Sequence, residues 1–120
     1  MTATHVMVVL ADPAPGRDAE LDEWYADHLR RMSAVDGVVA VRRLVPVTGF
    51  GSDPGHRSIA LYELRTDDLT STVAMLAAAR ATFPATDAFA RDPVVWFLEP
   101  AAIDVPRPDV PRPAVIGDQP

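Results

Sequence analysis

The chain has 120 residues, the length of one domain with enough chain to bury a core. Hydrophobic residues make up 48% of it and no apolar run reaches the length of a membrane span, so we expect a globular cytoplasmic protein. The formal net charge of -6 argues against a nucleic-acid partner, because phosphate binding needs clustered Lys and Arg. The chain has no cysteine, which excludes disulfides, a thiolate nucleophile and cysteine-based metal sites.

Three elements are predicted in the first half of the chain. Residues 4–10 (THVMVVL) are apolar and β-branched on both faces, as in a buried strand. Residues 12–16 (DPAPG) are a turn signal, and residues 17–35 then show the apolar spacing of an amphipathic helix. Gly37 stops this helix, and residues 38–47 (VVAVRRLVPV) predict a second strand.

The second half predicts two more strands and one more helix. Residues 57–64 (RSIALYEL) and 93–99 (PVVWFLE) have strand character, and residues 69–80 carry apolar positions at helical spacing. Six of the twelve prolines lie at position 100 or later. We therefore expect one domain over residues 1–100, followed by a proline-rich tail over residues 101–120 that is either an extended arm or disordered.

The element order β-α-β-β-α-β predicts an α+β fold of the ferredoxin-like type, a four-stranded antiparallel sheet with both helices on one face. The helices can cover only one face of this sheet, yet the predicted strands carry apolar residues at successive positions. A second copy of the sheet is the simplest cover for the other face. The sequence therefore predicts a homodimer joined sheet to sheet.

One histidine interrupts the apolar face of the first predicted helix. Apolar and aromatic residues recur along this face at intervals of three and four, and His28 lies near the middle of them, one turn after Tyr25. The face comprises Leu21, Trp24, Tyr25, His28, Leu29 and Met32. Hydrophobicity does not account for His28, so this position is the first candidate for a functional residue.

The same helix carries a family resemblance. Residues 23–29 (EWYADHL), 35–38 (VDGV) and 41–44 (VRRL) resemble the dimeric α/β-barrel superfamily, and most closely its EthD-like branch. That branch has a W/F-Y-x-x-H-L pattern in its first helix, then a V-x-G-V turn and an R-R/F strand. The likeness covers about the first half of the chain, and Arg30 stands where family members often have proline. It implies a pocket in each subunit, between the sheet and the helices.

Two residues of the first helix are the catalytic candidates. His28 could act as a general base or acid, because imidazole titrates near neutral pH. Tyr25 could donate a hydrogen bond to a substrate carbonyl or enolate oxygen. The alternative is structural: a backbone carbonyl satisfies His28, and Tyr25 only fills the core.

Further residues are candidates for substrate binding, with structural alternatives for some of them. His5 starts the first strand and could instead be a fraying residue, and Arg42 or Arg43 could pair with Glu63 at a sheet edge. The three histidines lack the spacing of metal ligands, so no metal site is expected. The predicted substrate-binding set is Trp24, His5, Arg43, Tyr62 and Trp96.

These features together predict a small cofactor-independent enzyme. It would use the pocket histidine for proton transfer on a hydrophobic cyclic or polyketide-like molecule, as an isomerase, cyclase, dehydratase or lyase. One alternative is a cofactor-independent monooxygenase. The other is a non-catalytic dimeric protein that binds a hydrophobic metabolite. The expected partners are that small molecule and a second copy of the chain, with no nucleic acid and no membrane.

Overall fold

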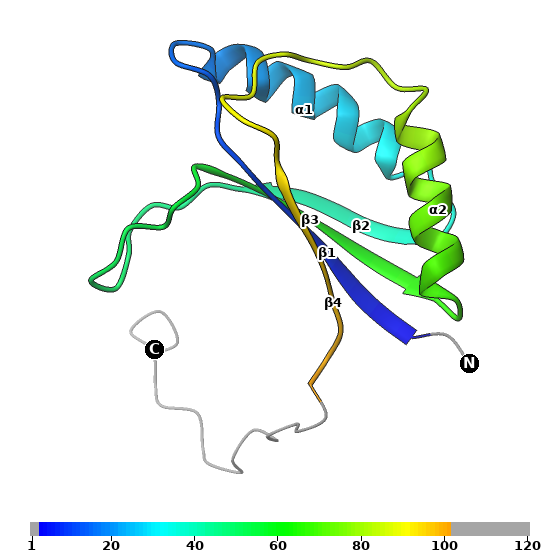
Figure 1. Cartoon of the computed structure of the whole chain (residues 1–120). Helices are drawn as coiled ribbons and strands as arrows, with labels where there is room; N and C mark the ends of the chain where they lie inside the picture. The colour runs from blue at the N-terminus through cyan, green and yellow to red at the C-terminus, as the bar shows by residue number, and fades with distance from the viewer. Residues whose placement is uncertain (1–2, 102–120) are drawn as a thin grey trace, which may run out of the picture.

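The computed structural model describes residues 3–101 of the chain. Its elements follow the predicted order (Figure 1). They are β1 (Ala3–Ala11), α1 (Asp18–Met32), β2 (Val38–Leu44), β3 (Ser58–Thr66), α2 (Leu69–Arg80) and β4 (Val94–Leu98). The predicted tail over residues 101–120 lies outside the described residues, except for its first position.

The strands form one antiparallel sheet in the order β2-β3-β1-β4. Both helices lie on the same side of this sheet (Figure 1). The predicted α+β, ferredoxin-like class is therefore confirmed. Neither helix, among residues 3–101, is long and apolar enough to cross a membrane.

The second strand is shorter than predicted. It ends at Leu44, whereas the sequence pattern continued to residue 47. Pro46 has no backbone N–H to donate to the sheet, so the pairing with β3 stops two residues before it. The chain then leaves the sheet as a long loop to Ser58, which projects away from the sheet in Figure 1.

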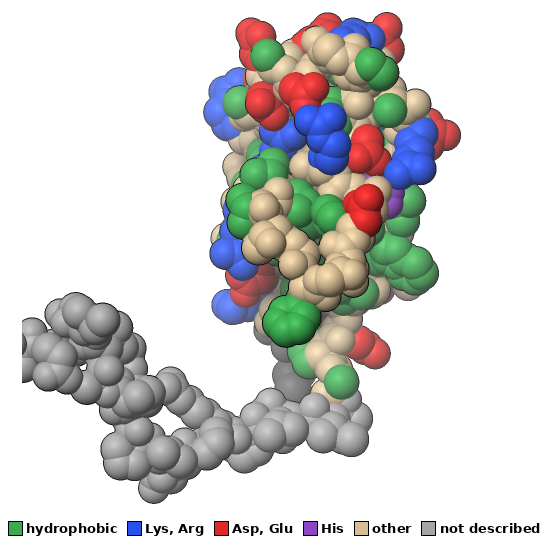
Figure 2. Space-filling model, turned by 90° about the vertical axis from the view of Figure 1, so that its left-hand side faces the viewer, with side chains coloured by type: hydrophobic (Ala, Val, Ile, Leu, Met, Phe, Trp, Pro, Cys, Tyr) green, Lys and Arg blue, Asp and Glu red, His purple; other side chains and the backbone are tan. Residues whose placement is uncertain are grey.

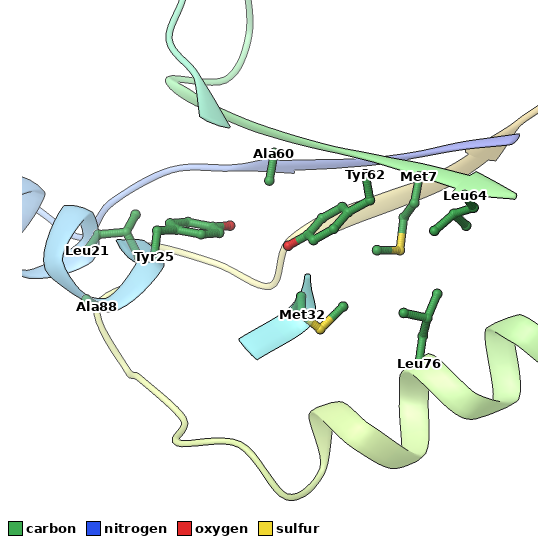
Figure 3. Packing of buried hydrophobic residues seen from close by; sticks show 9 residues of the cluster. All are labelled: Met7, Leu21, Tyr25, Met32, Ala60, Tyr62, Leu64, Leu76 and Ala88. Atoms are coloured by element: carbon green, nitrogen blue, oxygen red, sulfur yellow. The ribbon is translucent and has the colours of Figure 1, made fainter. Parts of the chain in front are cut away.

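The hydrophobic core fills the space between the sheet and the helices (Figure 3). Alternate residues of β1 and β3 point into it, as the twofold period of a strand requires. The buried residues of α1 follow the helical period, so the predicted apolar face does meet the sheet. The core cluster comprises Met7, Leu21, Tyr25, Met32, Ala60, Tyr62, Leu64, Leu76 and Ala88.

The segment between α2 and β4 runs along α1 (Figure 1). Trp24 Nε1 donates to the carbonyl of Pro84 at 3.0 Å, and Arg17 bonds to the side chain of Asp87 at 2.6 Å. Phe89 pairs with Pro13 in an isolated bridge. These contacts hold residues 81–93 against the helix and place Phe89 beside the core.

The face of the sheet opposite the helices is largely apolar. Val8 stands opposite Leu61 on one side and Trp96 on the other. The side chain of Trp96 is 59% exposed, and Leu98 on the same strand is 46% exposed. This face, called the open face below, is formed by the residues of each strand that point away from the helices. It carries more exposed apolar surface than scattered single residues would give.

Candidate functional site

A cavity of about 270 Å³ lies between the helices and strands β1, β3 and β4. Its wall is mostly apolar and comes from both helices, these three strands and the segment before β4. The apolar residues are Met7, Val9, Trp24, Met32, Val73, Leu76, Ala77, Phe89, Pro93, Val95 and Phe97. The polar ones are Tyr25, His28, Tyr62 and Arg80. Four predicted site residues, Trp24, Tyr25, His28 and Tyr62, therefore meet in one cavity wall.

His28 is held inside this wall as a neutral ring. Its side chain is 6% exposed, and the Trp24 ring stacks on it with centroids 4.2 Å apart. Burial, helped by the charge of Arg80, lowers the pKa of His28 from 6.5 to about 4. Nδ1 is buried and has no hydrogen-bond partner within residues 3–101. The structural alternative for His28 would require a backbone carbonyl to accept a hydrogen bond from the ring, and Nδ1 has no such partner among the described residues. A buried polar atom without a partner calls for an explanation.

The two tyrosines face one another across the cavity. Tyr25 comes from α1 and Tyr62 from β3, and their hydroxyl groups point toward each other in Figure 3. Each side chain is 2% exposed. Burial raises the pKa of both phenols, so both stay protonated at neutral pH. The pair can therefore serve as hydrogen-bond donors inside an apolar space.

Arg43 supports Tyr25 from outside the cavity. Its guanidinium carbon lies 4.6 Å from the centroid of the Tyr25 ring, a cation–π contact. Nε donates to Ser58 Oγ at 3.1 Å, and the side chain forms an ion pair with Asp22. Glu63, the partner expected for Arg42 or Arg43, belongs to the open face and is therefore not the partner of Arg43, and among residues 3–101 it forms no ion pair with Arg42 either. Arg43 is not part of the cavity wall.

Two other predicted site residues are not in the cavity wall. His5 Nε2 lies 3.6 Å from a carboxylate oxygen of Glu99, near the start of β1. Trp96 belongs to the open face, because its neighbours Val95 and Phe97 take the positions that face the helices. The expectation that Trp96 lines the pocket is therefore corrected, and Phe97 is the aromatic residue that β4 contributes.

Sequence reasoning missed Arg80, Phe89 and Phe97. Residues that face the helices alternate with residues that face away along β4. This alternation would have identified Phe97 as a cavity residue if the inward face of the strand had been known. Phe89 lies in a segment without regular structure, and Arg80 reads only as the basic last residue of α2. Within residues 3–101, no three His, Cys, Asp or Glu side chains are grouped so that they could hold a metal ion.

The fold and this cavity define a ferredoxin-like α+β protein with a mostly apolar cavity between its sheet and its helices. No protein-family model matches the chain, and no curated protein is significantly similar to it. Solved structures do share its fold. One is a protein from Arabidopsis thaliana, with a TM-score of 0.63 and 12% identity, over 84% of this chain and 99% of that chain.

Two further solved structures share the fold of this chain. The heme degrader MhuD from Mycobacterium tuberculosis has a TM-score of 0.60 and 19% identity, over 85% of this chain and 99% of its own. A candidate antibiotic biosynthesis monooxygenase from Bordetella bronchiseptica has a TM-score of 0.55 and 13% identity, over 82% and 98%. At these identities the likeness is one of fold, and the activity has to be argued from the site.

Proposed function

We propose that this protein is a small enzyme that removes a proton from a flat, hydrophobic cyclic molecule, with His28 as the base. The observation that carries the proposal is the state of His28 itself. It is a neutral imidazole in the wall of an apolar cavity, with a buried nitrogen that has no partner among the described residues. Such a ring can accept a proton, and pocket groups with perturbed pKa values are candidates for catalysis.

The size of the cavity limits the substrate. About 270 Å³ lies at the lower end of the roughly 300–1,000 Å³ of small-molecule sites. A molecule of one or two fused rings suits this space, and the four-ring porphyrin of a haem is larger than such a molecule. His28 is also the one histidine in the cavity wall, and Trp24 stacks on its ring. We therefore do not assign a haem to this chain.

The tyrosines complete the proposed chemistry. Loss of a proton from carbon next to a carbonyl places negative charge on the carbonyl oxygen. Tyr25 and Tyr62 would donate hydrogen bonds to that oxygen, in a space where such bonds are stronger than in water. His28 would then return the proton to another atom of the substrate. Isomerisation, cyclisation, dehydration and lyase-type cleavage can each begin with this step.

A cofactor-independent monooxygenase is the second candidate. It is supported by the likeness to the Bordetella bronchiseptica protein and by the apolar wall, which suits molecular oxygen. The first step would be the same removal of a proton. The enolate would then give electrons to O₂, so that a CH₂ group becomes a carbonyl that keeps one oxygen atom, and the other oxygen leaves as water with both hydrogens.

We also propose that the open face pairs with a second copy of the chain. Val8, Leu61 and Trp96 lie side by side on it, and the area is apolar enough to need a cover. A dimer in size-exclusion chromatography with light scattering is expected, and Trp96→Glu should give a monomer. A monomeric wild type would contradict this. Membership of the EthD-like branch stays a prediction from residues 23–29.

The test of the catalytic proposal uses 2-tetralone, a bicyclic ketone with exchangeable hydrogens beside its carbonyl. We expect the wild type to accelerate its hydrogen–deuterium exchange in D₂O, measured by NMR, and His28→Gln to lose that acceleration. His5→Gln is the matched control, because His5 also has a buried Nδ1 without a partner among the described residues but lies outside the cavity wall.

Three outcomes separate the alternatives. Exchange that persists in His28→Gln rules out His28 as the base. Binding of 2-tetralone without accelerated exchange in the wild type supports the non-catalytic binding protein. Uptake of oxygen in an electrode cell, lost in His28→Gln, supports the monooxygenase.

A further inference from the structure

The charge of the cavity wall contrasts with that of the whole chain. The chain has 17 acidic and 11 basic residues, yet the wall contains Arg80 and neither Asp nor Glu. With His28 neutral and both phenols protonated, the wall carries one positive charge. An apolar site with a single cation is complementary to an organic anion.

Most other arginines of the described part already have carboxylate partners. Figure 2 shows basic and acidic side chains interspersed over the upper part of the molecule. Within residues 3–101, Arg42, Arg65 and Arg80 form no ion pair with a carboxylate. The paired arginines are Arg17, Arg30, Arg31, Arg43, Arg57 and Arg91.

Arg80 differs from the other two in its place. Arg42 and Arg65 belong to the open face, whereas Arg80 lines the cavity. It is the last residue of α2, where the helix dipole favours a base. The dipole explains a basic residue at this position, but it does not explain why its side chain forms part of the cavity wall.

Arg80 and His28 lie at different depths in the cavity, and this difference favours one orientation of a bound ligand. Arg80 is exposed to solvent while also lining the cavity, so it lies at the mouth. His28 is 6% exposed and lies inside. A ligand that satisfies both positions has its ring among the apolar residues near His28 and its charged group at the mouth, where that group keeps part of its hydration.

We propose that Arg80 binds the carboxylate of the ligand, and that the substrates are flat cyclic carboxylates of one or two rings. This proposal deepens the proposed function and rests on it for the identity of the site. The charge of Arg80 disfavours protonation of His28. A bound carboxylate would offset that charge and make His28 a stronger base in the complex than in the free protein.

The test compares two probes of equal shape, 2-naphthoate and its uncharged analogue 2-naphthamide. Their dissociation constants are measured by NMR titration, which also reports whether each variant is folded. We expect the wild type to bind the carboxylate at least about tenfold more tightly than the amide, as a charged hydrogen bond allows. Arg80→Gln should lose this preference by weakening only the carboxylate.

Arg65→Gln is the matched control, since it removes another arginine without an ion pair among residues 3–101, but on the open face. It should keep the wild-type preference. Equal affinity of the wild type for both probes, or no binding of the carboxylate, overturns the proposal, as does a preference that persists in Arg80→Gln. His28→Gln should keep the preference while losing exchange of 2-tetralone, so that failure of the base and failure of the anion site give different results.

Discussion

Protonation of His28 should destabilise the folded protein as the pH falls. Burial and the charge of Arg80 lower the pKa of this ring in the folded state from 6.5 to about 4. The unfolded chain leaves the ring in water with its ordinary pKa. Between these two values, the unfolded state therefore binds a proton that the folded state does not. The free energy of unfolding falls as the pH drops through 6.5, and the loss is complete below about 4.

The size of this loss follows from the two pKa values. Their full difference corresponds to about 3 kcal/mol, and roughly 2 kcal/mol of it is lost between pH 7 and pH 5. A domain of this size has a total stability of about 5–15 kcal/mol, so the loss is large enough to measure. This loss of stability arises from one side chain, because the folded state buries His28 as a neutral ring and protonation puts a positive charge on it.

The assay is urea unfolding of the wild type and His28→Gln at pH 7 and pH 5, at one protein concentration. Carboxylates that do not interact with His28, such as Asp68, whose pKa is lowered by hydrogen bonds from Ser71, affect both proteins equally. The wild type should lose about 2 kcal/mol more than the variant between the two pH values. Equal losses in the wild type and His28→Gln would refute the reasoning, as would a wild-type NMR titration that places the pKa of His28 near 6.5.

Three further predictions concern the residues around the cavity. Tyr25→Phe should slow the exchange of 2-tetralone by about tenfold or more, because one donor to the enolate oxygen is lost, and an unchanged rate would remove Tyr25 from the mechanism. Arg43→Met should lower stability in urea by about 1 kcal/mol through loss of the cation–π contact and the Asp22 pair, while 2-naphthoate still binds. Leu21→Ala should cost about 2–5 kcal/mol in the same assay, since Leu21 is 0% exposed, and a loss below 1 kcal/mol would contradict the packing of α1.

The sequence was sufficient for the fold because local patterns and element order agreed. The apolar face of residues 17–35 had to meet a sheet, and the order of strands and helices left the ferredoxin-like arrangement as the simplest way to provide one. The same face brought Trp24, Tyr25 and His28 together, since neighbours on a helix face lie at intervals of three and four residues. The part of the site that lies on one helix was therefore predictable.

The strand contribution was harder to predict, for a physical reason. Residues 94–98 (VVWFL) are apolar at every position, so alternation gives no sign of which face is inside. Trp96 is placed by its pairing with Val8, and Val8 lies on the open face because Met7 faces the helices. Such strands are typical of a sheet with both faces covered, and the property that suggested a dimer thus also hid the orientation of Trp96.

The charge of Arg80 affects how easily His28 takes up a proton, so the two residues have to be considered together. Free of ligand, the cavity holds one guanidinium at its mouth and a neutral ring inside. If His28 took a proton from an uncharged substrate, two positive charges would share an apolar space with only the new enolate between them. A carboxylate at Arg80 neutralises the first charge before the second appears. The anionic group of the substrate would then do more than hold it in place, because it would raise the basicity of His28 only in the complex. The base would therefore act faster on a bound carboxylate than on an uncharged ketone such as 2-tetralone.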